Sequence, residues 1–318
     1  MNSLEQLSLF IEEHCSAYRF KTEPSNLYDP LRYFMTLGGK RMRPILTIMG
    51  ADLFDVKKEE SIHAALAIEF FHNFSLIHDD IMDVAPLRRG KETVHEKWNT
   101  NIAILSGDAL LVEAYQNLAK YPDERLPILL KRFNETALEV CEGQQMDMDF
   151  ETKKTVSEQE YLEMIRLKTS VLLGCAFEFG AILGKQDEQT RARLYHFGVS
   201  LGIAFQIQDD ILDLYADPEK FGKQVGGDIL SNKKTLLLIS ALDTKDDRVN
   251  ELLEMEPTVF KIETAKTLLK ELGCLDKVTK VKEYYHAEAL KELDALSKME
   301  FNVKPLKDLS EFLLVREH

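Results

Sequence analysis

A five-residue acidic motif occurs twice in this chain, as Asp79–Asp83 and again as Asp209–Asp213. Each copy follows an apolar run without Gly or Pro, and each is followed within a few residues by a proline, Pro86 or Pro218. A helix interior does not tolerate proline. The sequence therefore predicts that both motifs lie at the ends of buried helices.

The spacing of the aspartates favours a metal site. Residues four apart on a helix share one face, about 5–6 Å apart, so Asp79 lies with Asp83 and Asp209 with Asp213. Carboxylates without His or Cys suit Mg²⁺, which keeps several waters and shares its coordination with substrate phosphates. One such motif is typical of a solvated acidic helix end. Two copies, each closing an apolar helix, favour metal binding.

The composition favours helices throughout. The 318 residues include only 15 Gly and 9 Pro, 45% are apolar, and strand alternation, tandem repeats and linker-like segments are not evident. We expect an all-α fold with a single domain spanning residues 1–318. The expected helices lie at about Leu4–Tyr18, Leu31–Leu37, Ile45–Phe54, Ile102–Ala119, Leu126–Asp147 and Ser157–Leu183, with the two motif helices and three or four more after Leu236.

Charge and cysteine usage narrow the class of protein. A net charge of −14 argues against nucleic acid as a partner. No apolar run reaches the roughly 18 residues of a membrane span, so we expect no stable membrane insertion. The four cysteines are isolated and lie mostly in apolar stretches, which predicts reduced core residues of a cytoplasmic protein.

Basic loops accompany the acidic motifs. Lys40, Arg41 and Arg43 precede a helix whose first turn holds Pro44, and a helix N-terminus beside cations is a good anion site. The alternative is an ordinary basic loop. Further cations follow the motifs, at Arg88, Arg89 and Lys91 and at Lys220, Lys223, Lys233 and Lys234. HExxH, P-loop and GxSxG motifs are lacking, so hydrolysis and nucleotide phosphoryl transfer are poorly supported.

Together these motifs resemble the trans-isoprenyl diphosphate synthase (polyprenyl synthetase) family, of the short- or medium-chain type, over roughly Leu31 to Thr235. The matching segments are GGKRxRP at Gly38–Pro44, the first acidic motif with its Arg-Arg-Gly, GQxxD at Gly143–Asp147, Lys168-Thr169, and the second motif preceded by Phe205-Gln206. The resemblance implies the isoprenoid synthase type I fold, a helical bundle around a deep central cavity, and a homodimer.

The resemblance also implies the reaction. An allylic diphosphate ionises, the double bond of isopentenyl diphosphate attacks the carbocation, and a proton is lost. Implied ligands of three Mg²⁺ ions are Asp79, Asp83 and Asp209, with Asp80 and Asp213 in or near the coordination shell. Implied allylic diphosphate ligands are Arg88, Lys168, Lys223 and Lys233, with Thr169 and Gln206 beside the cation. Implied isopentenyl diphosphate ligands are Lys40, Arg43, His72 and Arg89.

Product length depends on the floor of the tunnel. In the family this floor is commonly formed four, five or eight residues before the first Asp, here Ser75, Phe74 and Phe71. The alternative is ordinary core packing. With a large Phe74 and a small Ser75, we expect a geranylgeranyl (C20) product first and farnesyl (C15) next. One departure from the family is Thr235-Leu236-Leu237, where an aromatic residue and a proline are common.

Two other readings stay open at this point. A class I terpene cyclase also uses DDxxD, although its second metal motif is a mixed Asn/Ser/Glu pattern and it would not need the Lys40–Arg43 site. A non-catalytic subunit of a heteromeric prenyl synthase would bind partners only, and the intact acidic motifs argue against it.

Overall fold

The computed structural model describes residues 3–121, 124–216 and 225–314. The chain forms two compact units. The first consists of Met1–Phe133 with Ala176–Arg191, and the second of Asn134–Cys175 with Ala192–His318. Three helices, α7 (Arg125–Thr152), α9 (Val171–Leu183) and α10 (Glu188–Tyr215), begin in one unit and end in the other.

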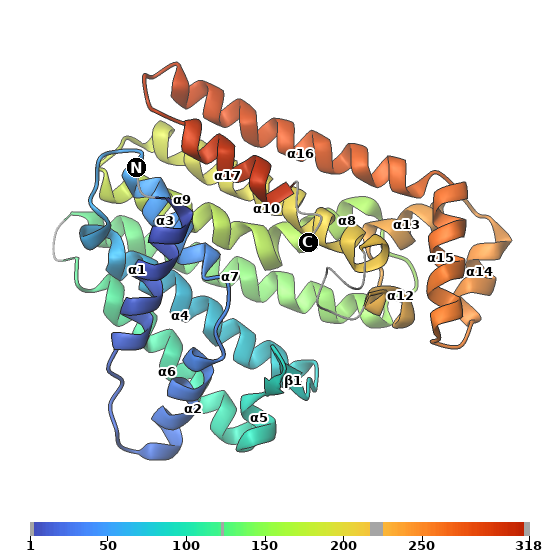
Figure 1. The fold of residues 1–318 in the computed structure, drawn as a ribbon, viewed down its shortest axis with the longest axis horizontal. Helices are drawn as coiled ribbons and strands as arrows, with labels where there is room; N and C mark the ends of the chain where they lie inside the picture. The colour runs from blue at the N-terminus through green and yellow to red at the C-terminus, as the bar shows by residue number, and fades with distance from the viewer. Residues whose placement is uncertain (1–2, 122–123, 217–224, 315–318) are drawn as a thin grey trace. The chain divides into compact units, whose positions relative to one another are not determined.

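The first unit is built around α4 (Lys58–Met82), which packs along α6 (Thr100–Leu118) and against α3 (Met42–Asp52) (Figure 1). The apolar run of α4 explains this position, because Ala64, Ile68 and Phe70 are fully buried. Its other elements are α1 (Leu4–Ala17), α2 (Ser25–Thr36), β1 (Leu87–Arg88), β2 (Lys91–Glu92) and α5 (Val94–Lys97).

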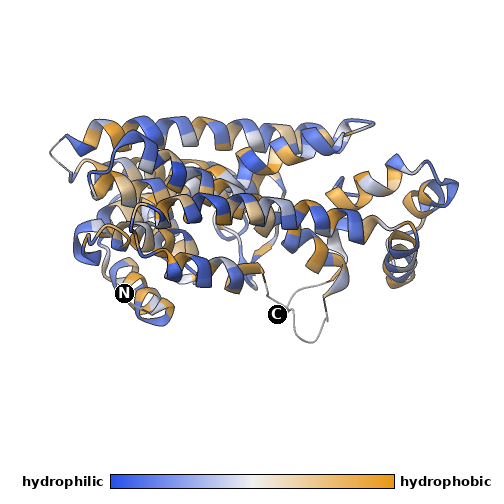
Figure 2. Cartoon of the chain, turned by 90° about the horizontal axis from the view of Figure 1, so that it is seen from above, coloured by the Kyte–Doolittle hydropathy of each residue, from blue (hydrophilic) through white to orange (hydrophobic). Residues whose placement is uncertain are grey.

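The second unit gathers a separate core. Its buried side chains include Ile207 on α10, Leu236 and Leu269. Besides the ends of the shared helices it contains α8 (Glu158–Ile165), the π-helical η1 (Arg166–Ser170), α12 (Gly227–Leu230), α13 (Leu236–Asp243), α14 (Asp247–Glu254), α15 (Val259–Glu271), α16 (Cys274–Ser297) and α17 (Lys304–Leu314). In Figure 1, α17 lies beside α16. Figure 2 shows hydrophobic and hydrophilic residues interspersed along the helices, as amphipathic packing requires.

The all-α expectation is confirmed, with two details that the sequence pattern missed. The expected helix Leu31–Leu37 starts earlier, because α2 runs Ser25–Thr36 and contains Pro30. Pro30 removes one N–H donor from the helix, and the burial of Pro30, Leu31 and Phe34 offsets that loss. After Leu236 the described chain has five helices rather than three or four, because the polar turn at residues 244–246 separates α13 from α14.

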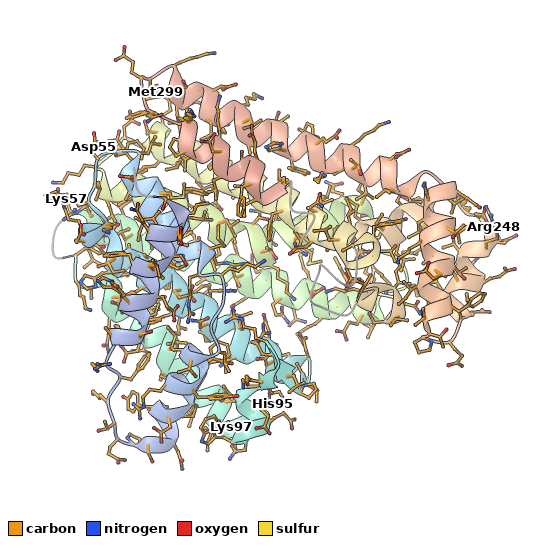
Figure 3. All side chains as sticks on the ribbon, in the orientation of Figure 1. Asp55, Lys57, His95, Lys97, Arg248 and Met299 are labelled. Carbon is orange, nitrogen blue, oxygen red and sulfur yellow. The ribbon has the colours of Figure 1, made fainter. Side chains whose placement is uncertain are left out.

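A short β-hairpin and a cation–π contact follow α4 in the first unit. Strands β1 and β2 pair antiparallel. Each strand has only two residues, which is too short for an alternating apolar pattern to show in the sequence. Beyond them, the Nζ atom of Lys97, labelled in Figure 3, lies 3.7 Å from the ring centre of Tyr33 and 5.2 Å from that of Trp98. This cation–π contact ties α5 to α2.

Gly174 and Gly180 lie at close contacts between helices. A Cβ at Gly180 would lie 2.2 Å from the carbonyl carbon of Gly50 on α3, and a Cβ at Gly174 would lie 2.7 Å from Val199 on α10. The prediction of core cysteines holds for Cys15, Cys175 and Cys274 but is wrong for Cys141, which is exposed on α7. Within the described residues, no helix has the length and apolarity needed to cross a membrane.

Candidate active site

The first acidic motif lies at the end of α4, as predicted. Asp83 is the C-cap residue, and its N–H donates to the Asp79 carbonyl at 2.8 Å. The N–H of Ala85 donates to the Asp80 carbonyl (2.9 Å) and that of Val84 to the Ile81 carbonyl (3.2 Å), the two bonds of a Schellman motif. Asp79 is half-buried and Asp83 exposed, whereas Asp80 is only 2% exposed. The outer two carboxylates are therefore accessible, and the middle one is not.

Arg88 forms an ion pair with Asp80, the middle aspartate of the motif. Its Nε donates to both oxygens of Asp80, at 2.9 and 2.8 Å, and its Nη2 lies 2.8 Å from Oδ1. A forked guanidinium–carboxylate pair of this kind fixes the orientation of both partners. Two predicted site residues are therefore in direct contact, and the Asp80 carboxylate is paired with the Arg88 guanidinium.

The hairpin explains how adjacent arginines serve different partners. The two turn residues, Arg89 and Gly90, both have positive φ (53° and 74°), as in the type I′ turns that suit two-residue hairpins. While Arg88 faces Asp80, the Nη1 of Arg89 donates to the Gly38 carbonyl. Gly39 has a φ of 134°, which favours glycine, and a Cβ there would lie 2.7 Å from that Nη1 atom.

Arg43 and His72 form a second linked pair. Arg43 Nη1 lies 3.1 Å from His72 Nε2. Burial and the surrounding arginines, Arg43 first among them, hold the pKa of His72 well below its usual value, so the ring is neutral and its Nε2 accepts the hydrogen bond from Arg43. Lys40 is exposed on the same loop. All four predicted isopentenyl diphosphate ligands therefore belong to the first unit, and each of them lies on the segment Gly38–Arg43 or contacts it.

Arg41 does not take part in the predicted cluster of exposed cations. It is 5% exposed, and its Nη1 lies 2.5 Å from Glu69 Oε1 while its Nη2 donates to the Met35 carbonyl at 2.8 Å. Its Nε also donates to Glu12, at 3.3 Å. Arg41 has a φ of 45°, and this left-handed backbone turns its side chain inward. Arg41 thus anchors the loop, because the buried Glu69 carboxylate and the Met35 carbonyl compensate the charge of its guanidinium.

In the second unit, the Asp147 carboxylate lies near two predicted diphosphate ligands, Lys168 and Lys233. Lys168 Nζ lies 2.5 Å from Asp147 Oδ2, and Lys233 Nζ lies 4.0 Å from the same atom. Asp147 is the last residue of the GQxxD motif. The motif marks Asp147 in the sequence, but it does not indicate that Asp147 contacts these two lysines. Lys223, the remaining predicted lysine, lies outside the described residues.

Lys168 and Thr169 lie in a π-helical turn instead of the continuous helix that the sequence predicts over Ser157–Leu183. The wider turn is closed by the hydroxyl of Ser170, which donates to the Ile165 carbonyl at 3.0 Å. Gly143 of α7 packs against it, since a Cβ there would lie 2.2 Å from the Lys168 nitrogen. Such turns are frequent at functional sites.

The second acidic motif lies in the last two turns of α10, again near a helix end. Asp209 is exposed, whereas Asp213 is half-buried and accepts the Asp228 N–H at 3.0 Å. Asp210 is buried and accepts from the Tyr161 hydroxyl and from Gln206 Nε2 (3.0 Å). Burial raises the pKa of Asp210 to about 7, and these two hydrogen bonds favour its ionised form.

Gln206 connects the motif to the π-helical turn. Its Oε1 accepts the Thr169 hydroxyl at 3.3 Å, so both residues predicted beside the carbocation belong to one hydrogen-bonded chain. Tyr161 is the member that the sequence did not reveal, because a tyrosine on an amphipathic helix is usually ordinary core.

The accessible carboxylates fit magnesium. Asp79 with Asp83, and Asp209 with Asp213, offer oxygen donors at helical spacing, which is the donor chemistry of Mg²⁺. Among the described residues, no three His, Cys, Asp or Glu side chains are already gathered as a complete metal cage.

The predicted floor residues lie on α4, one to two turns before Asp79. Phe71 is 1% exposed and packs edge-on against Phe133, with ring centres 5.3 Å apart. Phe74 is half-buried, with its ring centre 5.7 Å from that of Phe71 and 4.7 Å from that of His78. The Ser75 hydroxyl donates to the His72 carbonyl at 2.9 Å. Phe74 is therefore the more accessible of the two rings.

The chain is similar to known proteins over most of its length. A family model for polyprenyl synthetase matches residues 24–272. A geranylgeranyl diphosphate synthase of Methanosarcina mazei is 41% identical over 277 residues, covering 86% of this chain and 85% of the relative. A geranylgeranyl pyrophosphate synthase of Geoglobus acetivorans is 37% identical over 304 residues, covering 93% and 92%.

The chain is also similar to solved structures. A crystal structure of a geranylgeranyl pyrophosphate synthase has a TM-score of 0.93 and 45% identity, and covers 99% of this chain and 98% of that one. A polyprenyl synthase of Caulobacter crescentus, solved with calcium and isoprenyl diphosphate, has a TM-score of 0.85 at 26% identity, covering 99% and 98%. The family model spans both acidic motifs and the loops that follow them, and on this ground the chain belongs to the polyprenyl synthetase family.

Proposed function

We propose that this chain is a magnesium-dependent trans-prenyltransferase that joins isopentenyl diphosphate head-to-tail to an allylic diphosphate. The products are a longer trans-prenyl diphosphate, C20 first and C15 next, and diphosphate. The observation that carries this proposal is the pair of accessible carboxylates at each helix end, Asp79 with Asp83 and Asp209 with Asp213, in a chain of the polyprenyl synthetase family. The relatives named as geranylgeranyl synthases support C20 and give no support to a cyclase or a non-catalytic subunit.

In the first unit, Asp79 and Asp83 hold magnesium, and Arg88 binds the allylic diphosphate in the orientation that Asp80 sets. In the second unit, Asp209 holds magnesium, with Asp213 beside it, and Lys168 and Lys233 bind diphosphate oxygens. When bound, three magnesium ions neutralise the charge that develops on the leaving diphosphate. The lysines and arginines add fixed positive charge to the same effect, which is electrostatic stabilisation of the transition state.

The oxygens of Thr169 and Gln206 stabilise the allylic cation that remains when the diphosphate leaves. These oxygens are linked by a hydrogen bond before substrate arrives, so little reorganisation is needed during the reaction. The departing diphosphate then accepts the proton that the condensed product loses. Water has to be kept from the cation, and closure of loops over bound substrate would achieve this.

Isopentenyl diphosphate binds to Lys40, Arg43, Arg89 and His72. The neutral His72 ring accepts from Arg43 and thereby holds that guanidinium in place, and the Gly38 carbonyl does the same for Arg89. Prepositioned guanidinium groups match phosphate oxygens in a forked geometry. Lys40 contributes a flexible point charge.

Several finer points belong to the same proposal. We propose that Lys223 is a further diphosphate ligand, that the enzyme is a homodimer acting in the cytoplasm, and that residues 1–318 work as one polyprenyl synthase domain. Phe74, with Phe71 behind it, limits the growing chain, and the small Ser75 leaves room for C20.

The test is to incubate the purified chain with Mg²⁺, isopentenyl diphosphate and, separately, the C5, C10 and C15 allylic diphosphates, and to identify the products by mass spectrometry. A discrete C20 prenyl diphosphate is expected. No condensation with any primer, in protein that is folded by circular dichroism, would contradict the proposal and direct attention to a cyclase or an accessory subunit.

A further inference from the structure

Tyr161 lies at the end of a directed hydrogen-bond chain that reaches the predicted cation-stabilising residues. Tyr161 is 2% exposed on α8, and its hydroxyl donates to Oδ2 of Asp210. The other oxygen of Asp210 accepts from Gln206 Nε2 at 3.0 Å, and Gln206 Oε1 accepts from Thr169 at 3.3 Å. All four residues belong to the second unit.

The direction of this chain follows from the chemistry of its members. Burial and the neighbouring Asp210 hold the pKa of Tyr161 well above its usual value, so its hydroxyl remains a donor. A carboxylate that accepts at both oxygens can bind Gln206 only through the amide NH₂. The amide oxygen must then face Thr169, and the Thr169 hydroxyl must donate its hydrogen to it.

This direction decides what Thr169 and Gln206 present to a substrate. Because the Thr169 hydrogen is held by Gln206, the Thr169 oxygen keeps its lone pairs for an electron-poor group. A reversed Gln206 amide would instead offer N–H donors to Thr169 and would turn the hydroxyl hydrogen away from Gln206. Such a dipole would repel a carbocation.

We propose that Tyr161 is a positioning residue of the prenyl transfer reaction, which acts through Asp210 to fix the orientation of the Gln206 amide and the Thr169 hydroxyl. This inference rests on the proposed function. It gives Asp210 a role within the protein, because Asp210 is buried and both of its carboxylate oxygens accept hydrogen bonds from protein side chains.

The first variant to measure is Tyr161→Phe, which removes only the hydroxyl and keeps the packing of the ring. We expect kcat to fall on the order of 10- to 100-fold, since small misplacements of catalytic groups have effects of this size. The KM for isopentenyl diphosphate and the Mg²⁺ concentration for half-maximal rate should stay within about twofold of the wild type. A role limited to stability would instead lower the melting temperature and leave kcat unchanged below it.

Tyr195→Phe is the matched control. Tyr195 is similarly buried (9% exposed), belongs to the same unit, and its hydroxyl donates to Glu139 at 3.4 Å rather than to the acidic motif. Its kcat should remain within about twofold of the wild type.

A double-mutant cycle tests the route of the effect. In a Gln206→Leu background, Tyr161→Phe should cost less than about twofold in kcat, because the group it positions is gone. Asp210→Asn, which tests the same link without altering Tyr161, should lower kcat and show the same non-additivity. Wild-type kcat in Tyr161→Phe, full multiplicativity with Gln206→Leu, or a shifted Mg²⁺ dependence would overturn the inference. Inactivity of the wild-type chain would instead reject the proposed function.

Discussion

Arg88 contacts Asp80 through three nitrogen–oxygen distances of 2.8 to 2.9 Å. Asp80 is the middle aspartate of the first acidic motif. The two residues are eight positions apart, and between them the helix ends in the Schellman motif, where Val84 has a φ of 48°. The motif therefore has two kinds of aspartate. The outer two are accessible to solvent, and the middle one is buried and paired with Arg88.

Asp80→Ala and Arg88→Ala test this division in a double-mutant cycle. Each single change should lower kcat/KM by about 100-fold, equivalent to roughly 3 kcal/mol, because Asp80 acts through Arg88. In the Arg88→Ala background, Asp80→Ala should add less than about twofold. Independent effects that multiply would show that Asp80 acts directly, as a metal ligand would. Steady-state kinetics with varied allylic diphosphate supplies the measurement.

Asp79→Ala and Asp209→Ala address the metal sites. Each should lower turnover by about 10³-fold or more, equivalent to about 4 kcal/mol of barrier, while circular dichroism stays unchanged. Chelation by EDTA should stop the wild-type reaction, and excess Mg²⁺ should restore it. Asp308→Ala, at an exposed position of α17, is the control and should keep normal turnover. Near-normal rates in either motif variant would be incompatible with the metal sites.

The Arg41–Glu69 pair makes a prediction about stability. Arg41→Met should cost about 3–5 kcal/mol of unfolding free energy, because Glu69, itself 3% exposed, loses its cation in the interior. Adding Glu69→Leu should recover much of that loss, since the buried charge is then absent as well. Urea unfolding followed by circular dichroism measures both variants. If the double variant is as unstable as the sum of the two singles, the pair is not coupled.

The floor residues predict product length. Each isoprene unit adds five carbons, and burying them in an apolar tunnel contributes about 4 kcal/mol per cycle, so removing a blocking ring should lengthen the product. Phe74→Ala and Phe71→Ala should each shift the products beyond those of the wild type in mass spectrometry. Phe70→Ala is the matched control, because Phe70 is buried next to Phe71 but packs against Tyr18, with ring centres 4.7 Å apart. Unchanged lengths in both variants would reject this floor.

The thiols should differ sharply in reactivity. Cys141 is exposed, whereas burial, with help from Glu69, raises the pKa of Cys15 to about 12. Because the thiolate is the reactive form, a disulfide reagent at pH 8 should modify Cys141 fast in the native protein and reach all four thiols only after denaturation. Cys141→Ser should abolish the fast phase. Fast modification that survives this substitution would contradict the burial of the other three.

The all-α class, the helix ends at both acidic motifs and the positions of the basic loops can be predicted from the sequence, because apolar periodicity, proline positions and helical spacing are local properties. Glycines inside an apolar helix, such as Gly174 and Gly180, indicate close helix contacts, and the structure has such contacts at both. His72 lies seven residues before Asp79, and helical periodicity places the two on one face of the helix.

Which charged residues face inward, and which pairs they form, becomes clear from the packing of the folded chain. Arg41 and Arg43 are two positions apart, yet one is anchored on Glu69 and the other contacts His72. The π-helical turn at Lys168 packs closely against Gly143 of another helix, and the Tyr161 hydroxyl donates to Asp210 across 49 positions of sequence. Such pairings depend on how elements far apart in the chain pack together, and local periodicity carries no information about that.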